Sequence, residues 1–405
     1  MADADRRFDL VLFGATGFTG QLVAEYLTRR AAGTPLRWAL AGRSRGRLEA
    51  IRAGLAAIDP AITVELVVAD ALDLAAMTEL ARDTTTVCTT VGPYARLGAP
   101  LVAACVAAGT AYCDLTGEVP FIRASIDRHH RAAQATGARI VHCCGFDSVP
   151  SELGVWLLQR ALEERAGRGA ASVTALFELR GQMSGGTVAS LLGVVDAAAR
   201  DRATRRLLGD PYGLDPVDGP RGHDRDRRGP GYDRTLGRFT APFVMAAINT
   251  RVVRRSHALL GHPWGVAGRY DEAMGLPRSP VGAALAVGVT GALAGFVAAS
   301  QVPRLRALLE ARLPKPGDGP SAAARARGRY RVRVHGTVDG TTVTATVADD
   351  LDPGYDGTAK LLGEAALALA LDPPCSDGGV LTPMVALAPT LAPRLRAAGV
   401  TLDVA

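Results

Sequence analysis

The chain has 405 residues, a length that favours two domains, or one domain with a large insertion, and a composition that allows a sizeable core. Its formal charge is +6, but the basic residues are almost all arginines, with lysine only at Lys315 and Lys360. No basic block with interleaved aromatic residues occurs, so a nucleic-acid-binding protein is not expected.

Cysteine and histidine residues give no sign of a metal site. The six cysteines lie mostly within apolar segments and show no C-x-x-C spacing, which is typical of buried thiols in a reducing compartment. His129 and His130 have no further ligand at a useful helical offset. The chain enters its first apolar segment almost at once, which leaves no room for a signal peptide, so we expect a cytoplasmic protein without a metal.

The glycine-rich stretch from Gly14 to Gly20 is the strongest local signal. An apolar run at residues 10–13 predicts a buried parallel strand, and an apolar helical pattern from Leu22 predicts a helix after it. At such a turn Gly14 permits the sharp bend, Gly17 lets a pyrophosphate approach the backbone, and Gly20 lets the helix pack closely on the strand. The N–H groups of the first helical turn are then free to hold an anion, which predicts a dinucleotide site.

The end of the second strand indicates which dinucleotide binds. A second apolar run, residues 36–41, ends in Gly42-Arg43-Ser44, where an NAD-dependent enzyme places an acidic residue on the ribose hydroxyls. Arg43 would instead hold a 2′-phosphate through paired charged hydrogen bonds. The pattern therefore favours NADP over NAD; the alternative is an arginine that simply faces water.

Strand patterns continue to alternate with helix patterns, at residues 63–69, 86–91, 111–115 and 139–144. Six such strands predict a Rossmann-type doubly wound parallel sheet, in which ligands bind along the carboxyl edge of the strands. Asp70 would lie at this edge beside the adenine side of the coenzyme, and Asp73 is expected to cap the next helix.

Two loops at the carboxyl edge supply candidate catalytic residues. Val91-Gly-Pro-Tyr94 follows the fourth strand, where Gly92 and Pro93 would let the backbone pack on the nicotinamide, and Tyr94 is either a proton donor or an aromatic lid. Asp147 and Ser148 follow the sixth strand. They either cap the next helix, which is expected to begin near Pro150, or take part in the reaction.

A second α+β domain is expected to bind the substrate. Residues 330–338 and 341–347 alternate with period two around Asp339-Gly340, which predicts a hairpin, and with residues 173–180 they predict an antiparallel or mixed sheet. We therefore expect a nucleotide domain at 1–150, a substrate domain at 151–350, and C-terminal helices at 351–405 that pack back on the nucleotide domain.

Two segments of the second domain have unusual composition. Residues 209–237 are rich in Pro, Gly, Asp and Arg and predict a long surface loop or a mobile lid. Residues 281–299 carry no charge; their length suits a membrane span, whereas their modest hydrophobicity favours a buried or interface helix or one lying on a membrane surface. Between them, Arg251 and Arg254 are spaced to share a helical face, directed either at an anionic substrate or at solvent.

Six motifs together resemble one known family, the saccharopine dehydrogenase-like oxidoreductases, and within it the actinobacterial trans-acting enoyl reductases. The resemblance covers nearly the whole chain except residues 209–237. The motifs are Gly14-Ala-Thr-Gly-Phe-Thr-Gly20, Ala41-Gly-Arg-Ser44, Val91-Gly-Pro-Tyr94, Tyr112-Cys-Asp-Leu-Thr-Gly-Glu118, Gly145-Phe-Asp-Ser-Val-Pro150 and Gly379-Val-Leu-Thr-Pro383.

The resemblance implies an NADPH-dependent reductase. In that branch the proposed substrate is an enoyl thioester carried by a polyketide synthase that lacks its own reductase, in polyketide or lipid biosynthesis. The expected NADP(H) residues are Gly14, Thr16, Gly17, Phe18, Thr19, Gly20, Arg43, Ser44, Asp70, Val91, Gly92, Pro93 and Gly117. Hydride would pass to the β-carbon, with Tyr94 as the first candidate donor near the thioester and Asp147 or Ser148 behind it.

Two alternatives follow from the same resemblance. The family also contains amino-acid dehydrogenases that act on imine adducts, a reaction for which Arg251 and Arg254 are the cluster able to bind substrate carboxylates. A non-catalytic, lipid-associated NADP-binding protein is the second alternative. The expected partners are an acyl substrate, either a small molecule or bound to a carrier protein, a polyketide synthase, a second copy of the chain, and a membrane surface contacted peripherally through residues 281–299.

Overall fold

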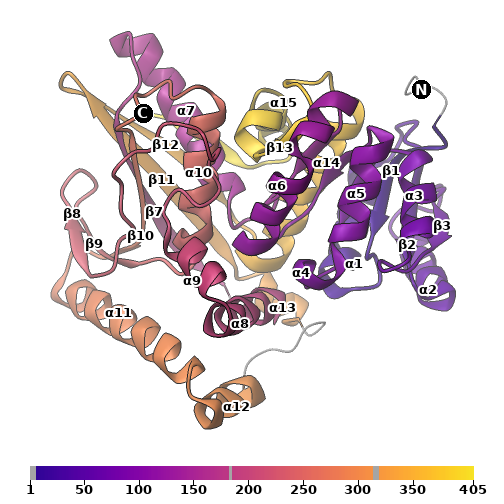
Figure 1. Ribbon diagram of the computed structural model, residues 1–405, viewed down its shortest axis with the longest axis horizontal. Helices are drawn as coiled ribbons and strands as arrows, with labels where there is room; N and C mark the ends of the chain where they lie inside the picture. The colour runs from indigo at the N-terminus through magenta and orange to yellow at the C-terminus, as the bar shows by residue number, and fades with distance from the viewer. Residues whose placement is uncertain (1–5, 182–184, 313–318) are drawn as a thin grey trace.

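Two seven-stranded sheets organise the fold, with helices on their faces and between them (Figure 1). The computed structural model describes residues 6–181, 185–312 and 319–405. The sequence predicts a linker at residues 314–326, and its part up to residue 318 lies outside the described residues.

The first sheet is parallel throughout, in the order β3-β2-β1-β4-β5-β6-β13. The predicted Rossmann-type sheet is therefore confirmed, and a seventh strand from the C-terminal tail extends it. The strands are β1 (Phe8–Phe13), β2 (Trp38–Gly42), β3 (Glu65–Val68), β4 (Thr84–Thr89), β5 (Ala111–Cys113), β6 (Arg139–Val141) and β13 (Gly379–Leu381).

Helices cover both faces of this sheet because its strands are apolar on both sides. Along β1, Leu10 and Leu12 enter the hydrophobic core on one face, and Val11 and Phe13 enter the core on the other. The first face carries α1 (Phe18–Ala31), α2 (Arg45–Ala56) and α14 (Thr358–Leu371); the second carries α3 (Leu74–Arg82), α5 (Ala99–Ala108) and α6 (Val119–Thr136). Asp73 caps α3 as predicted, by accepting from the N–H groups of Ala75 and Ala76.

The second sheet is mixed, in the order β14-β12-β11-β7-β10-β9-β8, with β7 and β10 parallel and the other pairs antiparallel. The expected hairpin is present, and Asp339 and Gly340 at its turn have φ of 48° and 82°. The strands are β7 (Ser172–Arg180), β8 (Gly231–Asp233), β9 (Arg238–Pro242), β10 (Arg269–Leu276), β11 (Arg329–Val338), β12 (Thr341–Asp349) and β14 (Thr401–Val404).

Helix α7 (Val149–Ala166) connects the two sheets: it begins after β6 and packs on β11 and β12. The approach is so close that a Cβ at Gly154 would lie 2.5 Å from Val334 Cγ2. Helices α10 (Ala246–Leu259) and α15 (Pro383–Ala397) pack on α7, and the buried carboxylate of Glu152 ties the three together. It accepts hydrogen bonds from the Ser256 hydroxyl and the Met384 N–H, and burial raises its pKa to about 8.

Helix α11 (Pro280–Ser300) follows β10, begins beside β9 at one end of the second sheet and projects away from it toward α12 (Pro303–Arg312) (Figure 1). Only 11% of its most apolar 18-residue window is buried. By length and composition it is long and apolar enough to cross a membrane. The interpretation of 281–299 as a helix buried within this chain is therefore wrong, which leaves an interface or a membrane contact.

Candidate functional site

The turn between β1 and α1 can form only with glycine at two of its positions. Gly14 has φ of +97°, and a Cβ there would lie 2.8 Å from Thr90 Oγ1. A Cβ at Gly20 would overlap the carbonyl oxygen of Gly14, so α1 packs directly on the end of β1. Gly17 differs, because a Cβ there would meet only the Gly14 carbonyl, at 3.4 Å. The chain itself does not need glycine at Gly17, and the open space in front of this residue suits a ligand.

The start of α1 is available to an anion. Gly17 occupies the N-cap position, no side chain caps the helix, and the first turn contains no acidic residue. Thr16, Phe18 and Thr19 are partly exposed around the same turn. Unpaired N–H groups and the positive end of the helix dipole attract phosphate, so these residues fit the pyrophosphate of NADP(H).

Arg43, Ser44 and Asp70 lie together at the carboxyl ends of two paired strands. Gly42 at the end of β2 is in register with Val68 at the end of β3. Arg43 and Asp70 are exposed, while Ser44 caps α2 by accepting from the Arg47 N–H. An exposed guanidinium beside the end of β2 is available to a 2′-phosphate, as the NADP assignment requires.

The loop after β4 exposes Gly92 and Pro93, but Tyr94 is turned away from solvent. Tyr94 is 4% exposed, its hydroxyl donates to the Thr89 carbonyl at 3.1 Å, and burial raises its pKa well above the ordinary range. The expected role of Tyr94 as proton donor is therefore wrong: the side chain packs under the loop and supports it.

Glu118, which sequence reasoning left out of the site, holds this loop in place. Its buried carboxylate accepts from the N–H groups of Tyr94 at 3.0 Å and Ala95 at 2.8 Å, at the start of α4 (Tyr94–Leu97). It also accepts from the Ser190 hydroxyl of α8 (Gly185–Arg200) at 3.0 Å. Beside it, a Cβ on Gly117 would approach Met245 and Ile248 to 3.8 and 3.9 Å, so Gly117 faces the start of α10. The sequence signal that could have identified Glu118 was its position as an acidic residue at the end of the motif that begins at Tyr112.

Ser148 lies at the N-cap position of α7 but does not cap it. Its hydroxyl donates to Asn249 Oδ1 at 3.1 Å, and Asn249 Nδ2 donates to Glu272 Oε2 at 3.0 Å. Glu272 is fully buried and also accepts from the hydroxyls of Ser151 and Tyr270; burial raises its pKa to about 7. The capping interpretation is therefore wrong for Ser148, which begins a buried polar chain into the second sheet.

Asp147 precedes Ser148 at the carboxyl edge of the parallel sheet. Part of the residue remains accessible, but protein surrounds most of it, and this burial raises the pKa of its carboxyl to about 6. A carboxyl group that is partly protonated near neutral pH is suited to donate a proton.

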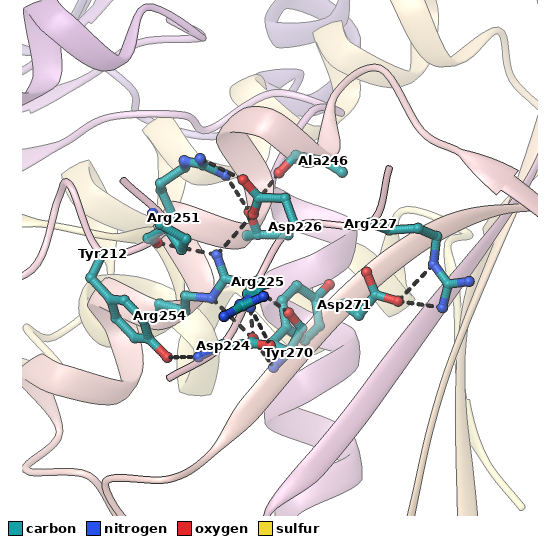
Figure 2. A network of polar contacts seen from close by, with 12 residues as sticks. Tyr212, Asp224, Arg225, Asp226, Arg227, Ala246, Arg251, Arg254, Tyr270 and Asp271 are labelled. Carbon is teal, nitrogen blue, oxygen red and sulfur yellow. Dashed lines mark hydrogen bonds and ion pairs between the residues drawn. The ribbon is translucent and has the colours of Figure 1, made fainter. Parts of the chain in front are cut away.

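Arg251 and Arg254 form ion pairs with other residues of this chain (Figure 2). Both are buried, at 1% and 4% exposure, and both pair with carboxylates from the loop at residues 209–237. Arg251 Nη2 lies 2.6 Å from Asp226 Oδ2, and Arg254 Nη2 lies 2.9 Å from Asp224 Oδ2. Asp224 also accepts from the Tyr270 N–H of β10. The expected solvated face and the expected substrate contact are both wrong: the arginines fasten the loop, which is docked on α10 and β10.

Comparison with known proteins places the chain in a family. Residues 10–176 match the saccharopine dehydrogenase NADP binding domain. Trans-acting enoyl reductases of Mycobacterium ulcerans and Mycobacterium bovis are 44% and 43% identical to it over 420 and 417 residues, which cover 100% and 99% of this chain and 99% of each relative. The chain belongs to the trans-acting enoyl reductase family. It is an NADP-dependent oxidoreductase, and its coenzyme is NADP(H).

Two further matches are a curated relative and a solved structure. A Mycobacterium tuberculosis relative whose name also contains trans-acting enoyl reductase is 48% identical over 419 residues, which cover 100% of this chain and 99% of the relative. Saccharopine dehydrogenase (L-Glu forming) from Saccharomyces cerevisiae superposes with a TM-score of 0.52 at 14% identity, covering 98% of this chain and 99% of that one. That second likeness concerns the fold alone.

In this member of the trans-acting enoyl reductase family, we expect Gly17→Val to fold with near wild-type stability but to bind NADPH at least about tenfold more weakly, because the new side chain fills the phosphate approach. Gly20→Ala should instead lower the melting temperature, since its Cβ overlaps a backbone carbonyl. Fluorescence titration with NADPH and thermal unfolding measure the two effects. Undiminished NADPH affinity in Gly17→Val would contradict this use of the turn.

We expect Asp224→Ala to lower the free energy of unfolding by about 2–5 kcal/mol, because it removes the nearer of the two carboxylates that pair with the buried Arg254 guanidinium. Asp218→Ala is the matched control: Asp218 lies in the same loop but is exposed, so its loss should cost less than about 0.5 kcal/mol. Urea unfolding compares the variants. Equal stability of the two would show that the ion pair does not hold the loop.

Proposed function

We propose that the chain reduces the α,β-double bond of an enoyl thioester with NADPH. The observation that carries the proposal is the full-length similarity to proteins named trans-acting enoyl reductases. The bound coenzyme supplies the hydride, which goes to the β-carbon. The chain's own residues would orient the substrate at the carboxyl edge of the parallel sheet, exclude water, and deliver a proton to the α-carbon of the resulting enolate.

Asp147 is our candidate for the proton donor. It lies at the carboxyl edge, its pKa of about 6 keeps part of the population protonated near neutral pH, and it is close in sequence to a buried hydrogen-bonded chain. Ser148 is the first member of that chain and is bound to Asn249, so we assign it a positioning role. Glu272, behind Asn249, fixes the orientation of the amide.

Reduction of an imine adduct is less well supported, because the residues expected to bind its carboxylates are not free to do so. An amino-acid substrate needs cationic groups for its carboxylates, and the arginines expected to supply them pair with Asp224 and Asp226 instead. The relatives are named trans-acting, which supports a substrate presented by a separate polyketide synthase on its carrier protein.

We expect NADPH oxidation to depend on an enoyl thioester such as crotonyl-pantetheine and not on an imine adduct of glutamate. Asp147→Asn should lower kcat by about 100-fold or more while leaving NADPH affinity unchanged. Asp147 donates only when protonated, so wild-type kcat should fall as the pH rises through about 6, and the variant should lose this dependence. Initial rates followed by NADPH absorbance test both points.

The exposed Asp218→Asn is the control variant and should react like the wild type. An unchanged kcat in Asp147→Asn would reject the donor assignment. Tight NADPH binding without consumption of either substrate would reject enoyl reduction itself and favour a non-catalytic NADP-binding protein.

We also propose that α11 rests on the surface of a membrane, where an apolar acyl substrate is made. Val281, Leu285, Val287 and Val297 are 67%, 45%, 64% and 42% exposed. At 100° per residue they point to several sides of the helix, and a helix embedded in the surface layer of a membrane can bring more than one of these sides into lipid, whereas a folded partner covers one. Exposed arginines flank the helix at Arg278 and Arg304, which favours anionic headgroups.

The connections of α11 favour a surface position over a span. Helix α11 follows β10, and the chain after α12 returns to β11, which pairs with β7 in the same sheet as β10. A single crossing would place α12 on the far side of the bilayer from this sheet. Five of the six cysteines are buried free thiols, which is in keeping with a chain in the reducing cytoplasm.

We expect the protein to float with vesicles containing anionic phosphatidylglycerol more than with pure phosphatidylcholine vesicles. The double variant Leu285→Glu/Val287→Glu should lose this binding, because it places charges in the lipid-facing surface. Val217→Glu changes an apolar residue of the docked loop that is more exposed than either of these, at 74%, and should bind normally. If the double variant instead dissociates a dimer and leaves vesicle binding intact, the helix is an interface between two copies.

A further inference from the structure

Residues from the second half of the chain cover one side chain of the glycine-rich turn. Phe18, the first residue of α1, packs edge-on against Tyr355 of the π-helix η2 (Pro353–Gly357), with ring centres 5.1 Å apart. Its ring also lies directly against Gly319, where any side chain would overlap it. Residues 319–325, which we name the strap, therefore run across the side chain that begins the coenzyme-binding helix.

Arg325, at the end of α13 (Ala322–Arg325), is the single charged residue of the strap. Its guanidinium lies over the Phe18 ring, 5.5 Å from the ring centre. Nε donates to Asp356 Oδ2 at 2.8 Å, and Nη1 donates to the Pro320 carbonyl at 3.1 Å. The side chain is only 16% exposed, so these contacts hold a cation in a nearly enclosed position.

One nitrogen of this group is left for a ligand. Among the described residues, Nη2 of Arg325 has no hydrogen-bond partner, whereas Nε and Nη1 have one each. The ring beneath the guanidinium belongs to the first residue of α1, whose N-terminus is uncapped and carries no acidic residue. Phe18 thus links two anion-attracting groups, because it is the first residue of the uncapped helix and its ring contacts Arg325.

We propose that Arg325 is a coenzyme-binding residue, whose guanidinium, stacked on Phe18 and held by Asp356, donates from Nη2 to a pyrophosphate oxygen of NADP(H). The coenzyme site is then built from both halves of the chain: the turn supplies backbone N–H groups and the strap supplies a side-chain cation.

The test compares two variants that break the same ion pair. Arg325→Met removes the charge but keeps an apolar side chain over Phe18, and Asp356→Asn removes the carboxylate but keeps the cation. Arg327→Met, at an exposed position two residues later, is the control. Calorimetric titrations of the purified full-length chain measure its affinity for NADPH and for inorganic pyrophosphate, and thermal unfolding without ligand measures stability.

We expect Arg325→Met to weaken both ligands by about tenfold. Asp356→Asn, which loosens the guanidinium but keeps its charge, should weaken them clearly less, and Arg327→Met should bind them like the wild type. If the ion pair between Arg325 and Asp356 has only a structural role, Arg325→Met and Asp356→Asn should weaken binding equally. That outcome, or unchanged pyrophosphate affinity in Arg325→Met, overturns the proposal. If Arg325→Met does not fold, Arg325→Lys, which keeps the charge but not the planar fork, should bind pyrophosphate more weakly than the control, and equal affinity overturns the proposal.

Discussion

The close approach of α1 to the end of β1 is the constraint on which the rest of the structure depends. Because no side chain fits at Gly20, the helix can start directly above the turn and face its free N–H groups toward the carboxyl edge of the sheet. The same helix then receives the second half of the chain, since Tyr26 and Arg30 both donate to the buried carboxylate of Glu364 on α14. One steric requirement thus positions both the coenzyme turn and the helix that covers it.

Buried carboxylates join the elements around the site. Glu118 connects the loop after β4 with α8, Glu152 connects α7, α10 and α15, and Glu272 connects β10 with the start of α7. Each is almost fully buried and accepts several hydrogen bonds, so each can be satisfied in one arrangement of its neighbours. Such groups contribute more to a single geometry than to net stability, because their desolvation offsets much of the hydrogen-bond energy.

Local patterns were sufficient to predict the coenzyme half of the fold. The three glycines, the apolar strands and the Asp339-Gly340 turn each act over a few residues, and the structure agrees with the sheets that they predict. Groups that depend on distant partners were not predictable. The Arg254 side chain has the same helical spacing whether it meets solvent, substrate or Asp224, and only the course of the loop decides among them. Likewise, the composition of α11 does not reveal whether a neighbour covers it, and the direction of Tyr94 depends on Glu118.

The seventh strand of the parallel sheet has a consequence for how the protein is made. β13 pairs with β6, and α14 covers β1, β4 and β5, yet both elements come from the last fifty residues of the chain. When only the first half of the chain has been synthesised, the nucleotide-binding sheet therefore has one face partly uncovered and one edge unpaired. Nascent domains usually fold in order from the N-terminus. The first sheet is therefore completed by elements that are synthesised much later than its other strands, and until then it exposes apolar surface.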